Sequence, residues 1–273
     1  MKQLAVAFLF VAAWALPFAS VVATAPSEPD VEVEAIINKA LERATWAQEQ
    51  NFEARFRHSM TQRARKFNGD GEVTEDETLV YTVEPYQGVP YAKLLTKDGE
   101  PIAGDDLKDE EKRWEDFLEM LAEPPKEEEE EEDENSIIFN EELLERFTAE
   151  LTGIQDLRGR PTFVLEFEPR SGKLPERRQM DKALNKSRGQ LWIDQETYEI
   201  AKVNFEMKER VRLWWGILGS ISEVTGQFER EPVADDVWLN SKADMYFHVR
   251  VLFSTSRRGQ TTLWDEFEPV PNE

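Results

Sequence analysis

Alternation of apolar and polar residues is the dominant pattern of this chain, and residues 189–207 show it most clearly. Leu191 and Ile193 fall on one side of an extended segment, and residues 194–197 form a polar corner. Because successive side chains of a strand point to opposite faces, this segment predicts two antiparallel strands with one apolar face and one wet face. The apolar positions of the second strand are Ala201, Val203, Phe205 and Met207.

The same period of two recurs on both sides of this hairpin. It predicts strands at 52–60, 79–83, 91–95, 163–167, 245–253 and 261–267. Corners rich in Asn, Asp and Gly, which favour tight turns, occur at 68–71 and 98–99. About nine to eleven strands are therefore expected by this pattern, and the chain is predicted to be mainly β with some helix.

Two other segments have a helical period. Apolar residues at i, i+3, i+4, i+7, i+8 and i+11 follow Asp30, a candidate helix cap. They are Val33, Ile36, Ile37, Ala40, Leu41 and Ala44. A second helix is predicted from about Asp105 up to the two prolines at 124–125, which stop it. Strands with one apolar face need a cover for that face, so helices are expected to lie over the sheet.

The hairpin reads G-x-L-W-I-D-x-x-T-x-E-I-x-K-V from Gly189 to Val203, and it resembles a unit of the periplasmic lipoprotein-carrier superfamily of LolA, LolB and RseB-like half-barrels. Within that superfamily, the chain looks like a member related to outer-membrane lipoprotein-sorting proteins. The resemblance implies a curved antiparallel sheet, an incomplete β-barrel, with helices covering its concave face. Residues 24–273 would then form a single domain, with a helical and acidic insertion at about 100–146.

The first residues are typical of a secretory signal peptide. Lys2 precedes an apolar run that is shorter than the roughly 20 residues of a spanning helix, and Pro17 follows it. Small residues predict cleavage near Ala23, which would place residues 24–273 in the periplasm. The chain has no cysteine, which excludes a lipobox, disulfides and thiolate chemistry.

The chain is strongly acidic, with a formal net charge of −23. Because every phosphate contact needs a basic partner, no nucleic-acid partner is expected, and membrane contact should be only transient. Eight consecutive acidic residues at 127–134 have no apolar surface to bury and are expected to form a solvated spacer.

Catalytic and metal-binding motifs are absent from the sequence. His58 and His248 are the only histidines, each alone in a predicted strand, and no metalloprotease, nucleophile-elbow, P-loop or dinucleotide-binding motif occurs. No enzyme activity, cofactor or metal is therefore expected.

Apolar positions are the better candidates for a binding site. The segment 213–221 is apolar and glycine-rich, so it is either a connection within the core or a lid element that contacts an acyl chain or a bilayer. Inward-facing residues of the strands could equally be plain core or the wall of a cavity. The predicted ligand-binding residues are Val203, Phe205, Met207, Trp214, Trp215, Phe247, Val249 and Val251.

The resemblance implies a periplasmic carrier that holds a lipid or a lipoprotein acyl chain in the concave cavity. The alternative is an RseB-like envelope sensor or scaffold, which uses the same fold to bind an envelope protein.

Overall fold

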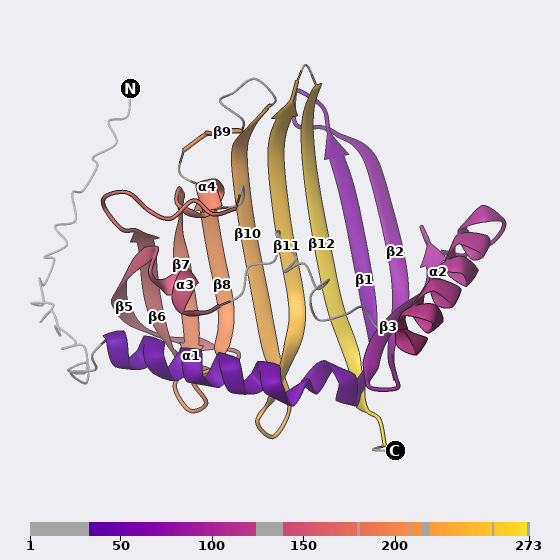
Figure 1. Cartoon of the computed structure of the whole chain (residues 1–273), viewed down its shortest axis with the longest axis horizontal. Helices are drawn as coiled ribbons and strands as arrows, with labels where there is room; N and C mark the ends of the chain where they lie inside the picture. The colour runs from indigo at the N-terminus through magenta and orange to yellow at the C-terminus, as the bar shows by residue number, and fades with distance from the viewer. Residues whose placement is uncertain are drawn as a thin grey trace, which may run out of the picture. The chain divides into compact units, whose positions relative to one another are not determined.

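The strands of this chain form one antiparallel sheet in the computed structural model (Figure 1). The structure describes residues 33–123, 139–178, 181–207, 209–213, 219–252 and 254–271. Within them, eleven of the twelve strands follow the order β4-β3-β2-β1-β12-β11-β10-β8-β7-β6-β5, and the twelfth, β9, pairs with β10 beside this path. The two end strands do not meet, so the sheet is an open half-barrel and not a closed barrel.

Most strands are long. The strands are β1 (Phe56–Phe67), β2 (Val73–Tyr86), β3 (Val89–Lys97), β4 (Glu100–Pro101), β5 (Phe147–Leu157), β6 (Arg160–Pro169), β7 (Ser187–Asp194), β8 (Ile200–Met207), β9 (Val211–Leu213), β10 (Gly219–Ala234), β11 (Val237–Val251) and β12 (Ser254–Pro269). The helices are α1 (Val33–Gln50), the 3-10 turn η1 (Phe52–Arg55), α2 (Asp105–Ala122), α3 (Glu141–Leu144) and α4 (Asp181–Leu184).

The corner between β1 and β2 shows how the local sequence sets a turn. The side-chain oxygen of Asn68 accepts hydrogen bonds from the backbone N–H groups of Asp70 and Glu72, both at 2.9 Å. Gly71 has φ of 86°, a backbone conformation that glycine adopts without a steric penalty. The predicted corner at 68–71 is thus confirmed as a hairpin turn.

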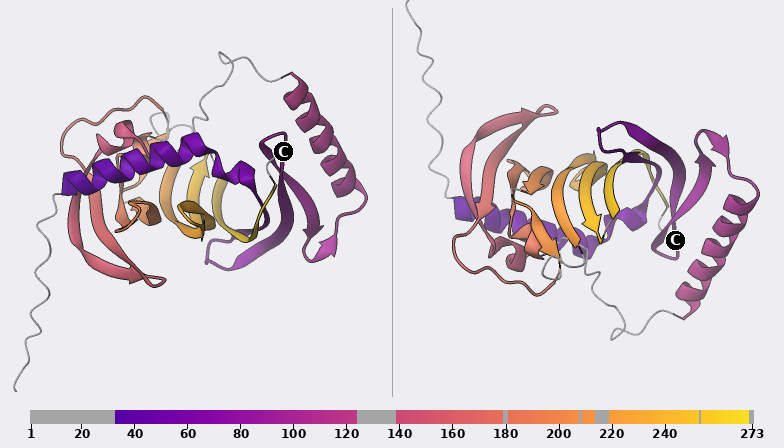
Figure 2. Two further views of the ribbon diagram at one scale, coloured as in Figure 1. Left: turned by 90° about the horizontal axis from the view of Figure 1, so that it is seen from below. Right: turned by 90° about the horizontal axis from the view of Figure 1, so that it is seen from above.

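The sheet is strongly curved, and helix α1 lies across its concave face (Figure 2). Register shifts interrupt several strand pairs, among them β1 with β12 and β10 with β11, and such bulges bend a sheet. Ile36 and Ala40 of α1 are 0% and 1% exposed, so one stripe of the helix is fully buried. The short helices α3 and α4 lie on the same side of the sheet (Figure 1).

Helix α2 has a different place, beside β3 near one end of the sheet (Figures 1 and 2). Trp114 and Phe117 of α2 contact Tyr91 of β3, with ring centroids 4.9 and 4.8 Å apart. Tyr91 also donates a hydrogen bond to Glu110 at 2.7 Å. The concave face is therefore covered by α1, α3 and α4 alone among the described helices.

The predicted fold class is confirmed: the chain is mainly β, with an open curved sheet and helices on its concave side. The predicted start of the first strand at Phe52 is wrong, because residues 52–55 form the turn η1 and the strand begins at Phe56. Phe52 and Phe56 belong to one buried cluster with Leu239, and a turn of helix places residues four apart on one side just as a strand does. Over so short a stretch, the alternation of apolar and polar residues does not distinguish a helical turn from a strand.

Two sequence features lie outside the described residues, namely the predicted signal peptide at 1–23 and the acidic run at 127–134. None of the helices in the described ranges combines the length and the hydropathy that crossing a membrane requires.

Candidate functional site: a cavity on the concave face

The apolar side chains of the concave face form the wall of a cavity. Cross-strand register places Leu191, Val203 and Phe228 side by side on β7, β8 and β10, and directly paired residues share a face. Nine further apolar wall residues come from β5, β6, β8, β10 and β11. They are Phe147 and Ala149 of β5, Phe167 of β6, Phe205 of β8, Ile221 and Val224 of β10, and Met245, Phe247 and Val249 of β11.

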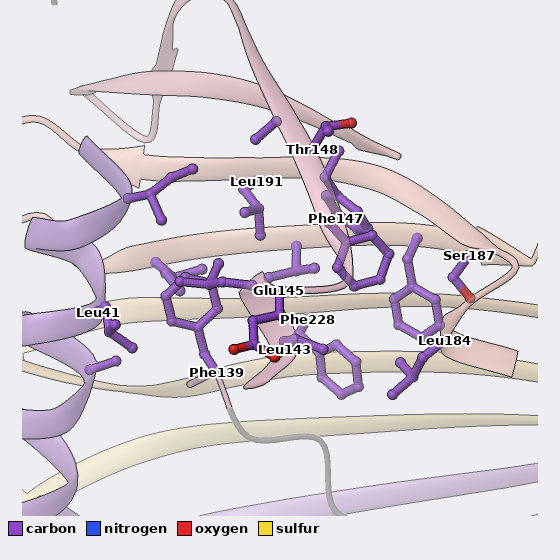
Figure 3. A pocket seen from close by; sticks show the side chains of 18 of the residues that line it. Leu41, Phe139, Leu143, Glu145, Phe147, Thr148, Leu184, Ser187, Leu191 and Phe228 are labelled. Carbon is purple, nitrogen blue, oxygen red and sulfur yellow. The ribbon is translucent and has the colours of Figure 1, made fainter. Parts of the chain in front are cut away.

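Helical segments enclose the cavity from the other side (Figure 3). Leu41 points from α1 toward the centre of the cavity, and Phe139 and Leu143 line it from the segment that includes α3. Ala183 and Leu184 contribute from α4. This partly open space has a volume of about 1520 Å³, above the roughly 300–1,000 Å³ of ordinary small-molecule sites.

Large apolar groups in this cavity are only partly covered by protein. Phe228 remains 39% exposed although it lies on the concave side, and Phe205, Phe247 and Val249 are half-buried. A folded protein usually buries such side chains against one another, because each one removed from water contributes about 1.5–3 kcal/mol. The concave face therefore keeps apolar surface that a ligand could cover.

Two glycines make room for the aromatic rings of the wall. A Cβ atom on Gly226 would overlap the ring of Phe205 and would lie 2.7 Å from the sulfur of Met245. A Cβ atom on Gly189 would overlap the carbonyl oxygen of Asn204 and come within 2.7 Å of the Phe167 ring. Because a β-carbon does not fit at either position, glycine here lets the rings of Phe205 and Phe167 lie flat over the neighbouring strand.

The charged groups deepest in the cavity wall are paired. Glu199, which is 2% exposed, accepts a hydrogen bond from Arg43 of α1 at 2.8 Å and forms a second ion pair with Arg230 of β10. Burial lowers the pKa of Arg230 to about 10, with the nearby charge of Glu53 acting to raise it and that of Arg43 to lower it. Burial also lowers the pKa of Arg43. These three side chains attach α1 to the sheet at one end of the cavity.

The hairpin motif places Glu199 for this contact. Asp194, which is 0% exposed, accepts two hydrogen bonds from Arg160 at 2.6 and 2.9 Å and others from the backbone and hydroxyl of Thr197. Burial raises the pKa of Asp194, but these hydrogen bonds outweigh it and the pKa is lowered overall. The Asp and Thr of the motif thus fix the corner, and its Glu holds the helix that covers the cavity.

A second buried ion pair positions the two short helices. Arg146, after α3, is 1% exposed and lies 3.1 Å from Asp181 at the start of α4. The Arg146 guanidinium also donates to Asn185 at 2.9 Å. Burial raises the pKa of Asp181, but backbone N–H groups of Arg178 and Arg177 and the charge of Arg146 lower it overall. The basic link between β6 and β7 is thereby attached to α3.

The structure brings four of the eight predicted site residues into the cavity: Val203, Phe205, Phe247 and Val249. Met207 is buried beside it in a cluster with Ala183, Val211 and Val224. Val251 follows Val249 on the same face, but it lies past the cavity and is 55% exposed. Trp214 and Trp215 lie outside the described residues.

Sequence reasoning did not single out the remaining lining residues. The α1 stripe contained Ile37, Leu41 and Ala44, which line the cavity, but the helical period does not separate them from the buried Ile36 and Ala40. Phe139, Leu143 and Phe147 had no usable signal, because the segment before β5 has neither a clear helical nor a clear strand period.

Ionisable side chains line parts of the cavity, but they do not form a metal site within the described ranges. Among the described residues, no three Asp, Glu or His side chains are arranged to hold a metal ion. His58 lies apart on β1, 6% exposed and 5.2 Å from the Phe267 ring, and burial lowers its pKa. The chemistry that the cavity itself offers is the binding of apolar groups.

Comparison with known proteins gives structural matches only. No family model and no curated protein matches the chain. A LolA superfamily protein from Nitrosomonas europaea matches at 12% identity and TM-score 0.32, covering 89% of this chain and 96% of the other. A putative outer-membrane lipoprotein-sorting protein domain from Vibrio parahaemolyticus matches at 13% identity and TM-score 0.30, covering 85% and 93%.

MucB in complex with the periplasmic part of MucA matches at 11% identity and TM-score 0.25, covering 88% of this chain and 100% of that one. TM-scores this low transfer no function to this chain, so its own cavity has to indicate what it binds.

Proposed function

We propose that this protein is a non-enzymatic carrier that holds an acyl chain of a lipid or a lipidated protein in the cavity of its concave face. The observation that supports this most directly is the large cavity whose walls are aromatic and aliphatic side chains left partly uncovered. Acyl chains need only such walls. Each buried methylene contributes about 0.8 kcal/mol, so a chain of about fifteen methylenes gains about 12 kcal/mol before the cost of association.

The size and the enclosure of the cavity support reversible binding of a long ligand. At about 1520 Å³ it is larger than a typical small-molecule site, and it has room for more than one chain. Its main cover, α1, joins the sheet through the buried Ile36 and Ala40 and the ion pair of Arg43 with Glu199, and not through strand pairing. A ligand can therefore enter without disturbing the pairing of the sheet.

The proposed compartment is the periplasm, which the signal-peptide pattern of residues 1–23 supports. N-terminal sequencing of the protein from its native cell should find a mature chain that begins near residue 24. Recovery of Met1 in a membrane-embedded form would contradict export with cleavage.

A charge on the cavity wall should abolish binding, because an unpaired charge in an apolar site is strongly disfavoured. Val249→Glu is expected to stop uptake of a fluorescent fatty acid by the delipidated protein. Leu263→Glu introduces the same charge on β12, away from the cavity, so uptake should be unchanged. Leu263 is 41% exposed and pairs with Lys242 of β11. Circular dichroism of both variants has to show a native sheet.

A second variant fills part of the cavity with an apolar side chain, which should disturb the fold less than a charge does. Ala149 is half-buried on the wall, and Ala149→Trp should occupy cavity space and lower uptake without creating a void. If the folded, delipidated wild-type protein takes up no acyl probe at micromolar concentration, the carrier function is wrong. Binding of a protein partner on the same fold would then be the function to test.

A further inference from the structure

One end of the sheet carries a cluster of arginines, although the chain as a whole is strongly acidic. Arg212 of β9, Ser220 of β10 and Arg250 of β11 pair in one cross-strand row, so their side chains share a face. Neighbouring strands are about 4.8 Å apart, which places Arg212 and Arg250 roughly 10 Å from each other. Arg210 reaches the same row and donates to the Ser220 hydroxyl at 3.1 and 2.6 Å.

The cluster continues onto β12. Arg257 pairs directly with His248 of β11, one row further along, and donates to the carbonyl oxygen of Asn68 at 2.7 Å. Arg250 donates to the carbonyl oxygen of Leu252 at 3.1 Å. Arg210, Arg212 and Arg250 are exposed and Arg257 is half-buried.

The hydrogen bonds that Arg210, Arg250 and Arg257 donate go to groups that carry no charge. In the described ranges, no carboxylate forms an ion pair with Arg210, Arg212, Arg250 or Arg257. The acidic residues beside the cluster are Glu209, which pairs with Lys186 at 2.7 Å, and the exposed Glu223, which lies opposite His248. Asp70 and Glu72 belong to the corner whose Asn68 carbonyl accepts from Arg257. Four guanidinium groups at one end of an acidic protein are therefore available to an external anion.

Exposed apolar side chains lie next to this arginine cluster. Val251 and Leu252, where β11 turns into β12, are 55% and 51% exposed. This turn lies at the end of the sheet opposite to α1 (Figure 1). We call the set Arg210, Arg212, Arg250, Val251, Leu252 and Arg257 the arginine tip.

The exposed valine also continues the wall of the cavity. Met245, Phe247 and Val249 line the cavity, and Val251 is the next residue on the same face of β11. The arginines lie on the opposite face of the same strand ends. An apolar track therefore leads from the cavity out to the tip, with positive charge along its outer side.

We propose that the arginine tip is a docking surface for a membrane that contains anionic phospholipid. Guanidinium groups bind phosphate oxygens through paired N–H donors, and aliphatic side chains at a turn insert into the acyl boundary of a bilayer. An acidic partner protein would form ion pairs with the arginines, but it would give no reason for the exposed Val251 and Leu252 beside them. The track to the cavity, which rests on the proposed function, would then be the path of an acyl chain between bilayer and protein.

Co-sedimentation with vesicles tests this surface directly. The mature wild-type protein should bind vesicles of two parts phosphatidylcholine and one part phosphatidylglycerol, and should bind pure phosphatidylcholine vesicles far less. Each basic side chain at an anionic surface strengthens partition about fivefold, so the combined Arg212→Gln, Arg250→Gln and Arg257→Gln variant should bind about a hundredfold more weakly. High salt should weaken the wild type in the same direction.

The matched control removes the same charge elsewhere. Lys93, Lys108 and Lys112 are exposed on β3 and α2, and their combined change to Gln should leave vesicle binding unchanged. For the apolar contact, Leu252→Ser should weaken binding, whereas Ile154→Ser, at a 46% exposed position on β5, should not.

Uptake of a soluble acyl probe separates this inference from the proposed function. The arginine variant should take up the probe as the wild type does, because none of its changed residues lines the cavity. A wild-type protein that takes up the probe but binds both kinds of vesicle equally, or an arginine variant that binds vesicles as the wild type does, would overturn the docking surface. Capture of an acidic protein by the tip without any vesicle binding would overturn it too.

Discussion

Gly226 shows how one missing side chain shapes the cavity. Phe205 lies on the neighbouring strand, directly opposite this glycine in the register of β8 and β10. Its ring occupies the space that a β-carbon on Gly226 would need. The position of a cavity-lining ring therefore depends on a residue that has no side chain of its own.

Gly226→Ala should displace the Phe205 ring and cost about 1–3 kcal/mol of unfolding free energy, the usual range for overpacking. Uptake of the acyl probe should also fall, since the displaced ring has to move into the cavity. Urea unfolding and probe titration measure the two effects. Gly69→Ala is the control, because a Cβ atom there meets nothing within 4 Å, and a loss of stability equal to that of Gly226→Ala would contradict this explanation.

Helix α1 has two apolar stripes with different roles. Ile36 and Ala40 are fully buried, whereas Ile37 and Leu41 face the cavity. Lys39 and Arg43 attach a third side of the helix to the hairpin, through Tyr198 at 3.1 Å and Glu199 at 2.8 Å. The helix is thus both a part of the core and a wall of the site.

Alanine substitutions should separate the two stripes. Ile36→Ala removes a side chain that is 0% exposed, so it should cost about 2–4 kcal/mol of unfolding free energy. Leu41→Ala should cost about 1 kcal/mol or less in the ligand-free protein, because the residue is only partly covered, yet it should weaken acyl uptake. Equal losses of stability, with uptake unchanged in Leu41→Ala, would show that both stripes are plain core.

At the scale of the whole molecule, net charge and charge distribution lead to different conclusions. The net charge of −23 indicates that anionic surfaces repel the chain. The arginine tip is an exception to this repulsion, because its four arginines and two exposed apolar residues can contact an anionic surface. The protein should therefore meet a membrane with this end of the sheet first, and added salt should weaken the contact.

Self-repulsion should also appear in the stability of the whole chain. Raising the salt concentration from near zero to well above physiological should increase the melting temperature, since it screens the repulsion among the excess carboxylates. Exposed ion pairs weaken under the same conditions, but each contributes only about 0–1 kcal/mol. A melting temperature that falls steadily with added sodium chloride would show that the ion pairs outweigh the repulsion.

The sequence by itself determined most of the elements. Period-two alternation located the β7–β8 hairpin and the strands around Phe163 and Phe247, and the 3.6-residue period located α1 and α2. Asn, Asp and Gly marked the corners after β1 and β3. These features are local, because the direction of a side chain along a helix or strand depends only on its spacing from its neighbours.

Only the tertiary structure decided which apolar residues are core and which line the cavity. Ile36 and Ile37 both belong to the apolar pattern of α1, and Met207 and Val249 both fit the alternation of their strands. The first residue of each pair is nevertheless buried, whereas the second faces the cavity. The place of α2 beside β3 and the gathering of arginines from β9, β11 and β12 were also decided there. All of these depend on which strands become neighbours, such as β1 with β12 and β8 with β10, and that adjacency joins residues far apart in the chain, for which a local pattern carries no signal.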